Sequence, residues 1–171
     1  MKKQIINISE LEYKPFPAPM PDNVKAKFEG ATLARVGPLV GAQKLGYGVT
    51  VVPPGKRAVP FHNHRVNEEL FFVLEGEGEV RIGSETFKIK KGDFIAHPPG
   101  GAETAHQIVN TSDKELKYLG VSTQLSPEIA DYPDSKKFGV MHVDGVDEKG
   151  VPKMFRFVGQ EDKSLGYWDG E

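Results

Sequence analysis

Residues 62–76 read HNHRVNEELFFVLEG, and this stretch decides both the fold and the chemistry that the sequence predicts. His62 and His64 stand at i and i+2, so on a strand their imidazoles point to one face and can hold one ion together. Glu69 follows at an odd offset from His64, and the chain between them must bend or bulge to bring its carboxylate to the same face. Without that bend, Glu68 is the carboxylate that faces the histidines.

A second stretch, GDFIAHPPGGAETAHQIVN at residues 92–110, contains another candidate ligand, His106. His106 is far from His62 and His64 in sequence, as we expect of a residue that completes a site from across a barrel. Three imidazoles and one carboxylate leave positions on an octahedral ion open to water or substrate. The sequence therefore predicts one divalent transition metal, Mn, Fe, Ni, Co or Zn, held by His62, His64, Glu69 and His106.

The rest of the chain is divided into short apolar runs by 19 glycines and 13 prolines. Runs of four to eight residues between turn-forming residues are typical of strands. We expect strands at residues 48–53, 68–74, 78–82, 85–89, 93–97, 106–109 and 116–122. The fold class is therefore all-β, a sandwich or barrel with little helix, and the expected core residues are Phe71, Phe72, Val73, Leu74, Val80, Ile82, Phe87, Ile89, Phe94 and Ile95.

The two ends of the chain differ from this central part. Residues 1–30 are expected to form an extended N-terminal arm, because four prolines fall in a polar segment at Pro15, Pro17, Pro19 and Pro21. Residues 31–125 form the predicted barrel. Residues 126–171 are predicted to be an extension with one short helix near residues 127–131 and an aromatic tail that packs on the barrel.

Composition excludes several classes of function. The 22 basic and 24 acidic residues give a net charge of −2, which does not favour nucleic acid as a partner. No apolar run approaches a membrane span or a signal peptide, so we expect no membrane association and a cytoplasmic location. The absence of cysteine excludes disulfides and thiolate ligands, which leaves imidazole, carboxylate and water to bind a metal.

The two histidine-containing stretches resemble the two motifs of the cupin superfamily. The first motif has a glycine, HxH, a glutamate and a second glycine. Its positions are matched by Gly55, His62, His64, Glu69 and Gly76, with one residue more than usual between Gly55 and His62. The second motif is matched by Gly92, Pro98, Gly100, His106 and Asn110. Five residues separate Gly100 from His106, where the motif usually has two. The extra residues lengthen a loop at the mouth of the expected barrel. The motif glycines are expected at turns with positive φ or where strands approach closely.

This resemblance implies a double-stranded β-helix, or jelly-roll barrel, with a metal inside. The whole chain is similar to bacterial single-domain cupins described as sugar-phosphate isomerase-like. The phrases that carry this narrower similarity are residues 62–83, PPGGAETAHQIVN at 98–110, DYPDSKKFG at 131–139 and YWDGE at 167–171. A homodimer is frequent among cupins, and the proline-rich arm is the segment expected to lie on a second subunit.

Three functions are compatible with this pattern. The first is a metal-dependent enzyme for a small polar substrate such as a sugar or sugar phosphate, with His97 and Glu103 as candidates for proton transfer. The second is an Fe- or Mn-dependent dioxygenase, since three histidines and a carboxylate also suit a redox metal. The third is a non-catalytic module that binds or senses a small ligand. The sequence alone does not separate them.

Overall fold

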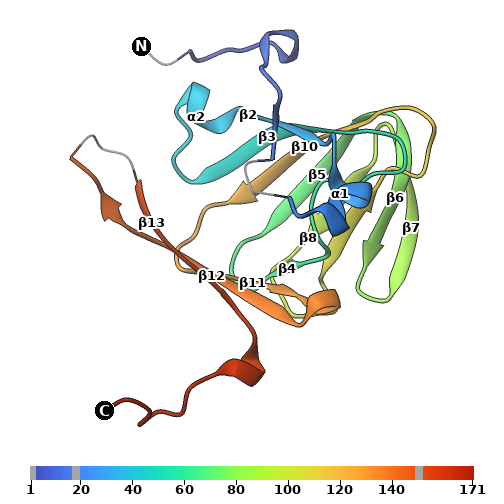
Figure 1. Ribbon diagram of the computed structural model, residues 1–171. Helices are drawn as coiled ribbons and strands as arrows, with labels where there is room; N and C mark the ends of the chain where they lie inside the picture. The colour runs from blue at the N-terminus through green and yellow to red at the C-terminus, as the bar shows by residue number, and fades with distance from the viewer. Residues whose placement is uncertain (1–2, 17–19, 149–151) are drawn as a thin grey trace.

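The computed structural model describes residues 3–16, 20–148 and 152–171, and its strands are arranged in antiparallel sheets (Figure 1). The largest sheet has the order β1-β2-β3-β10-β5-β8. Its strands are β1 (Lys14–Pro15), β2 (Thr32–Arg35), β3 (Leu45–Val52), β10 (Leu116–Thr123), β5 (Glu69–Glu75) and β8 (Phe94–His97). Every predicted strand in this sheet is present to within three residues at either end.

Two smaller sheets complete the barrel. One has the order β7-β6-β9, with β7 (Glu85–Lys90), β6 (Glu77–Ile82) and β9 (His106–Val109). The other has the order β13-β12-β11-β4, with β13 (Pro152–Gly159), β12 (Lys137–Val146), β11 (Glu128–Tyr132) and β4 (Asn63–His64). The last of these sheets joins the C-terminal extension to the strand that carries His64.

An apolar cluster lies between the six-stranded and three-stranded sheets. Val73 on β5 and Val80 on β6 are almost completely buried in it, and Leu116 on β10 packs there from the neighbouring strand. Such burial of aliphatic side chains is the main stabilising contribution to a barrel of this kind. The all-β prediction and the double-stranded β-helix are both confirmed.

The N-terminal segment is less extended than predicted. Helix α1 (Asp22–Phe28) follows Pro21, which occupies the position before the helix, and a second short helix, α2, spans Gly37–Val40. The seven residues after Pro21 contain no proline or glycine, so nothing interrupts a helix there. Pro17 and Pro19 lie outside the described residues. Within the described ranges, no helix is long and apolar enough to cross a membrane.

The short helix predicted near residues 127–131 is wrong, because strand β11 occupies this segment. Ala130 pairs with Gly139 on β12 on one side and with His64 on β4 on the other. Glu128 and Ala130 are both buried, as alternation along a strand requires. Pairing on both edges therefore outweighs the weak helical preference of the local sequence.

Two expected core residues and the aromatic tail lie at the surface. Phe87 is 46% exposed and Phe94 is 71% exposed, whereas Val73, Val80, Ile89 and Ile95 are buried as predicted. The Phe94 ring instead packs on the Phe72 ring, with the ring centroids 4.5 Å apart. The aromatic side chains of the C-terminal tail are exposed as well, and they belong to Phe155, Phe157, Tyr167 and Trp168. Figure 1 shows the last residues of the chain extending away from the barrel.

Candidate metal centre

The backbone brings the two histidine-bearing segments together. His62 and His106 form an isolated antiparallel bridge, in which each backbone N–H donates to the other residue's carbonyl, at 3.2 and 2.7 Å. His64 lies two residues on, in β4, and pairs with Ala130 of β11. Three imidazoles from two distant stretches of sequence are thereby brought close together.

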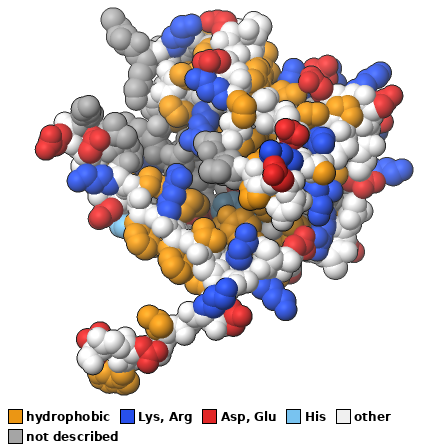
Figure 2. Space-filling model, viewed as in Figure 1, with side chains coloured by type: hydrophobic (Ala, Val, Ile, Leu, Met, Phe, Trp, Pro, Cys, Tyr) orange, Lys and Arg blue, Asp and Glu red, His pale blue; other side chains and the backbone are white. Residues whose placement is uncertain are grey.

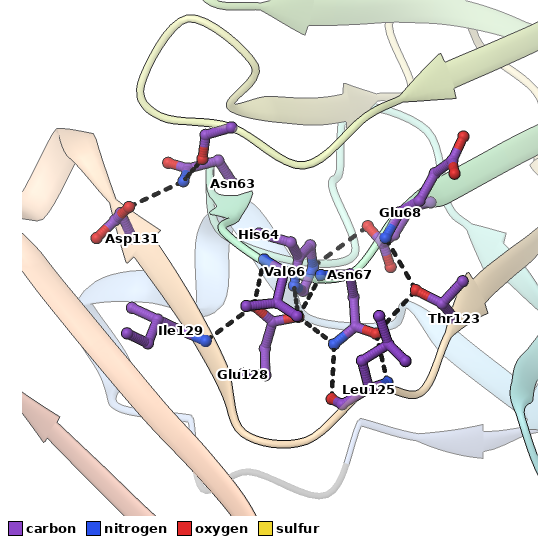
Figure 3. A network of polar contacts seen from close by, with 12 residues as sticks. Asn63, His64, Val66, Asn67, Glu68, Thr123, Leu125, Glu128, Ile129 and Asp131 are labelled. Atoms are coloured by element: carbon purple, nitrogen blue, oxygen red, sulfur yellow. Dashed lines mark hydrogen bonds and ion pairs between the residues drawn. The ribbon is translucent and has the colours of Figure 1, made fainter.

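The chain bends between β4 and β5 (Figure 3), and Glu69, the first residue of β5, contacts two of these imidazoles. The buried side chain of Asn67 holds the bend, since its carbonyl oxygen accepts hydrogen bonds from the Thr123 hydroxyl at 2.8 Å and the Leu125 N–H at 2.7 Å. Glu69 therefore begins β5 with its side chain facing inward, while Glu68 is exposed. Glu69 is the carboxylate that the structure places beside the histidines.

The side chains converge closely enough to share one ion. Ligand atoms of His62, His64 and Glu69 all lie within 4.8 Å of one another. The Glu69 carboxylate oxygen Oε2 is 3.4 Å from His64 Nε2 and 3.0 Å from Nε2 of His106. His106 and His64 thus contact the same oxygen of the Glu69 carboxylate.

Electrostatics favour an ionised carboxylate among the imidazoles. Burial alone would raise the pKa of Glu69, but the hydrogen bond with His106 and the close His64 imidazole outweigh it and hold that pKa well below its usual range. Burial, followed by the neighbouring His106, lowers the pKa of His62 to about 4. Burial would also lower the pKa of His64, but Glu69 and Glu128 reverse this effect and raise it. The centre therefore combines one negative charge with at least one neutral imidazole at physiological pH.

His97, one of the two candidates for proton transfer, lies directly behind the centre. It is 3% exposed, and its ring stacks on the His106 ring with centroids 3.8 Å apart. Within the described part of the chain, neither ring nitrogen has a hydrogen-bond partner. Burial, and then His106, lower the pKa of His97 to about 3, so that its ring is neutral at physiological pH.

Glu103, the other candidate, belongs to the loop that the sequence predicts at the barrel mouth. Its side chain is exposed, and its carboxylate accepts a hydrogen bond from the Gly101 N–H at 2.9 Å. This hydrogen bond lowers the pKa of Glu103. The structure does not bring Glu103 into contact with the imidazoles in the described ranges, and the carboxylate instead stabilises its own loop.

A cavity of about 410 Å³ opens beside the centre and reaches His62 and Glu69. Its wall is largely apolar, with Phe71 beside the two candidate ligands, and Arg35 on β2 supplies a positive charge. Figure 2 shows hydrophobic side chains around a hollow on this face, with histidine atoms visible inside it. The size and mixed lining suit a small molecule with a charged or polar end.

Sequence reasoning missed three residues near the centre: Asn67, Arg35 and Glu128. Asn67 and Arg35 carry no pattern that distinguishes them from solvated side chains. Glu128 had one available signal, since a strand over 128–132 would place its carboxylate on the same buried face as Ala130. The mistaken helix prediction hid that alternation.

Comparison with known proteins supports the same architecture. Residues 48–122 match the family model described as "Cupin domain". An uncharacterised protein of Methanocaldococcus jannaschii is 39% identical over 69 residues, which are 40% of this chain and 52% of that protein. The chain spans about half the length of the curated relatives that it matches.

Two solved structures cover nearly the whole chain. A protein of Silicibacter pomeroyi described as a sugar phosphate isomerase from a cupin superfamily has a TM-score of 0.76 and 23% identity, over 96% of this chain and 98% of that one. A putative sugar phosphate isomerase of Acidithiobacillus ferrooxidans has a TM-score of 0.65 and 25% identity, over 90% and 92% of the two chains. The similarity to the Silicibacter pomeroyi protein is evidence for the fold alone, because the two sequences are only 23% identical.

Proposed function

We propose that this chain, whose residues 48–122 match the family model of the cupin domain, is a metal-dependent enzyme acting on a small polar substrate such as a sugar or sugar phosphate. One divalent transition metal, Mn, Fe, Ni, Co or Zn, is held in this proposal by His62, His64, Glu69 and His106. The observation that carries it is the convergence of ligand atoms from His62, His64 and Glu69 within 4.8 Å of one another.

The donor set fits such an ion. Imidazole nitrogens and a carboxylate are the ligands that first-row transition metals take in proteins without cysteine. In the described part of the chain, both ring nitrogens of His64 are buried without a hydrogen-bond partner. Buried polar atoms are rarely left unpaired, and a cation between His64 and Glu69 would satisfy both groups.

The cavity beside the centre supports a small substrate. A metal held by these residues would supply polarisation of a carbonyl or hydroxyl group of such a substrate. The chain itself supplies the orientation, because Arg35 in the cavity wall offers a positive charge to an anionic group such as a phosphate. Neither His97 nor Glu103 lines this cavity, so we assign the proton transfer to neither of them.

The function is tested by offering the metal-loaded protein a panel of aldoses, ketoses and their phosphates, with interconversion followed by ¹H NMR. We expect turnover of at least one phosphorylated sugar without uptake of O₂. Arg35→Gln is expected to raise KM for that substrate about tenfold, because one charge-assisted contact is worth on the order of 1.5 kcal/mol. The metal content of the variant is expected to be unchanged, since Arg35 contacts none of the ligands.

Other outcomes point to the other two functions. Consumption of O₂ with Fe or Mn bound would contradict the isomerase proposal and favour a dioxygenase. Tight binding of a small molecule without turnover would favour a sensing module. An Arg35→Gln variant with unchanged KM would show that the charge at the cavity wall does not bind the substrate.

We also propose that the chain works as a homodimer. The β12–β13 ribbon projects beside the barrel (Figure 1), and a set of its apolar side chains is exposed in the single chain: Val143, Val146, Met154, Phe155, Phe157 and Val158. Association of subunits is a common way to cover such a surface. The cytoplasmic location stays a prediction.

A further inference from the structure

A buried carboxylate lies behind the candidate metal centre, and none of the roles assigned so far uses it. Glu128, the first residue of β11, is 4% exposed. Its Oε1 accepts hydrogen bonds from the backbone N–H groups of Val66 at 3.2 Å and Ile129 at 2.8 Å. Its Oε2 accepts from the backbone N–H of Asn67 at 2.9 Å and from the Asn67 side-chain amide (Figure 3). Because burying a charge is costly without such donors, this network holds the carboxylate in one place.

The same carboxylate faces one of the candidate ligands. Oε2 of Glu128 lies 3.5 Å from Nδ1 of His64, whereas Nε2 of His64 lies 3.4 Å from the Glu69 carboxylate. The His64 ring therefore stands between two carboxylates, one from β11 and one from β5. Both contacts are at ion-pair distance, and neither is a well-aligned hydrogen bond in this structure.

We propose that Glu128 is a positioning residue of the metal centre, which holds His64 with Nδ1 protonated and with Nε2 free to bind the cation. The inference rests on the proposed function, since it requires that a metal is bound. A histidine ligand commonly donates its second ring N–H to a carboxylate, which fixes the tautomer and makes the binding nitrogen more basic. Glu128 lies outside residues 48–122, so this part of the centre comes from the C-terminal extension.

A second acidic residue on β11 provides a matched control. The Asp131 carboxylate accepts hydrogen bonds from Arg65 at 2.8 and 3.0 Å and from the Asn63 side-chain amide at 2.8 Å. Asp131 thus fixes β4 to β11 through Asn63 and Arg65, the neighbours of His64, and none of these hydrogen bonds involves the His64 ring. Losing Asp131 perturbs the attachment of the strand while leaving the carboxylate–imidazole contact in place.

The experiment compares Glu128→Gln with Asp131→Asn by titrating each metal-free protein with Co²⁺ and following its visible absorption. Glu128→Gln is expected to raise the Kd for Co²⁺ about 10–100-fold and to change the shape of the absorption bands, because the His64 ring is no longer held in one orientation. Asp131→Asn is expected to leave the bands unchanged and to raise the Kd less than about threefold. Circular dichroism checks that both variants are folded.

The outcomes separate this inference from the proposed function. Equal Co²⁺ affinity and equal spectra for Glu128→Gln and the parent would overturn the inference and leave the metal centre intact. A parent protein that binds no Co²⁺ would overturn the proposed function itself. If Glu128→Gln does not fold, long-range ¹H–¹⁵N NMR of the Zn²⁺-loaded parent gives the answer directly. A proton on Nδ1 of His64 is expected, and a proton on Nε2 would contradict the assignment.

Discussion

Glu69→Gln is expected to weaken metal binding at least about 100-fold, because it removes the one anionic ligand from the centre. The substitution preserves the shape of the side chain, and the carboxylate it replaces contacts both His64 and His106. A neutral amide oxygen attracts a divalent cation far less strongly, and its NH₂ group cannot accept a hydrogen bond from either imidazole. Competition with a coloured chelator for Co²⁺ measures the change in Kd.

Glu68→Gln is the matched control for this variant. It makes the same chemical change at the adjacent residue, whose side chain is exposed and points away from the histidines. Its metal affinity is expected to equal that of the parent. If Glu68→Gln lost the metal while Glu69→Gln kept it, the bend at Asn67 would be one residue out of place and the ligand assignment wrong.

Gly76→Ala is expected to destabilise the protein by about 3–4 kcal/mol, which is large for a single methyl group. Gly76 has a φ of +83°, and a Cβ built on it would lie 2.3 Å from the backbone oxygen of Glu115 and 3.1 Å from the Cα of Leu116. An alanine would therefore carry the strain of a left-handed conformation and also push two strands apart. The midpoint of urea unfolding measures the loss.

The Gly92→Ala variant separates the cost of the backbone strain from the cost of the steric clash. Gly92 also has a positive φ, of +97°, but a Cβ built there would meet nothing within 4 Å. Only the backbone strain remains, so we expect a loss of about 1–2 kcal/mol. Equal losses in the two variants would show that the close approach of Gly76 to Glu115 contributes nothing to stability.

The sequence predicted the barrel well because its strands are punctuated by residues with one clear conformational role. Gly55, Gly76 and Gly92 all adopt the positive φ expected of them, whereas Gly100 has no positive φ and lies against the Thr104 side chain of its own loop instead of a neighbouring strand. The apolar runs between these turns located the strands, but they did not fix the face that each strand buries, since Phe87 on β7 and Phe94 on β8 are exposed. Strand β9 is present at residues 106–109 with the bounds that were predicted.

Other features depended on contacts that no local pattern reveals. The choice between Glu68 and Glu69 depends on Asn67, whose partners Thr123 and Leu125 lie more than fifty residues away in sequence. The position of Glu128 behind His64 depends on the pairing of β11 with β4. These long-range contacts decide where a carboxylate points, and spacing along the chain can only limit the alternatives.

The central claim, a transition metal held by the histidines and Glu69, is tested most directly by elemental analysis of protein purified without added metal or an affinity tag. The parent is compared with a His62→Ala, His106→Ala double variant. We predict about one equivalent of Mn, Fe, Ni, Co or Zn in the parent and its loss in the variant. A parent that is empty and that also takes up none of these five metals when they are added would contradict the account.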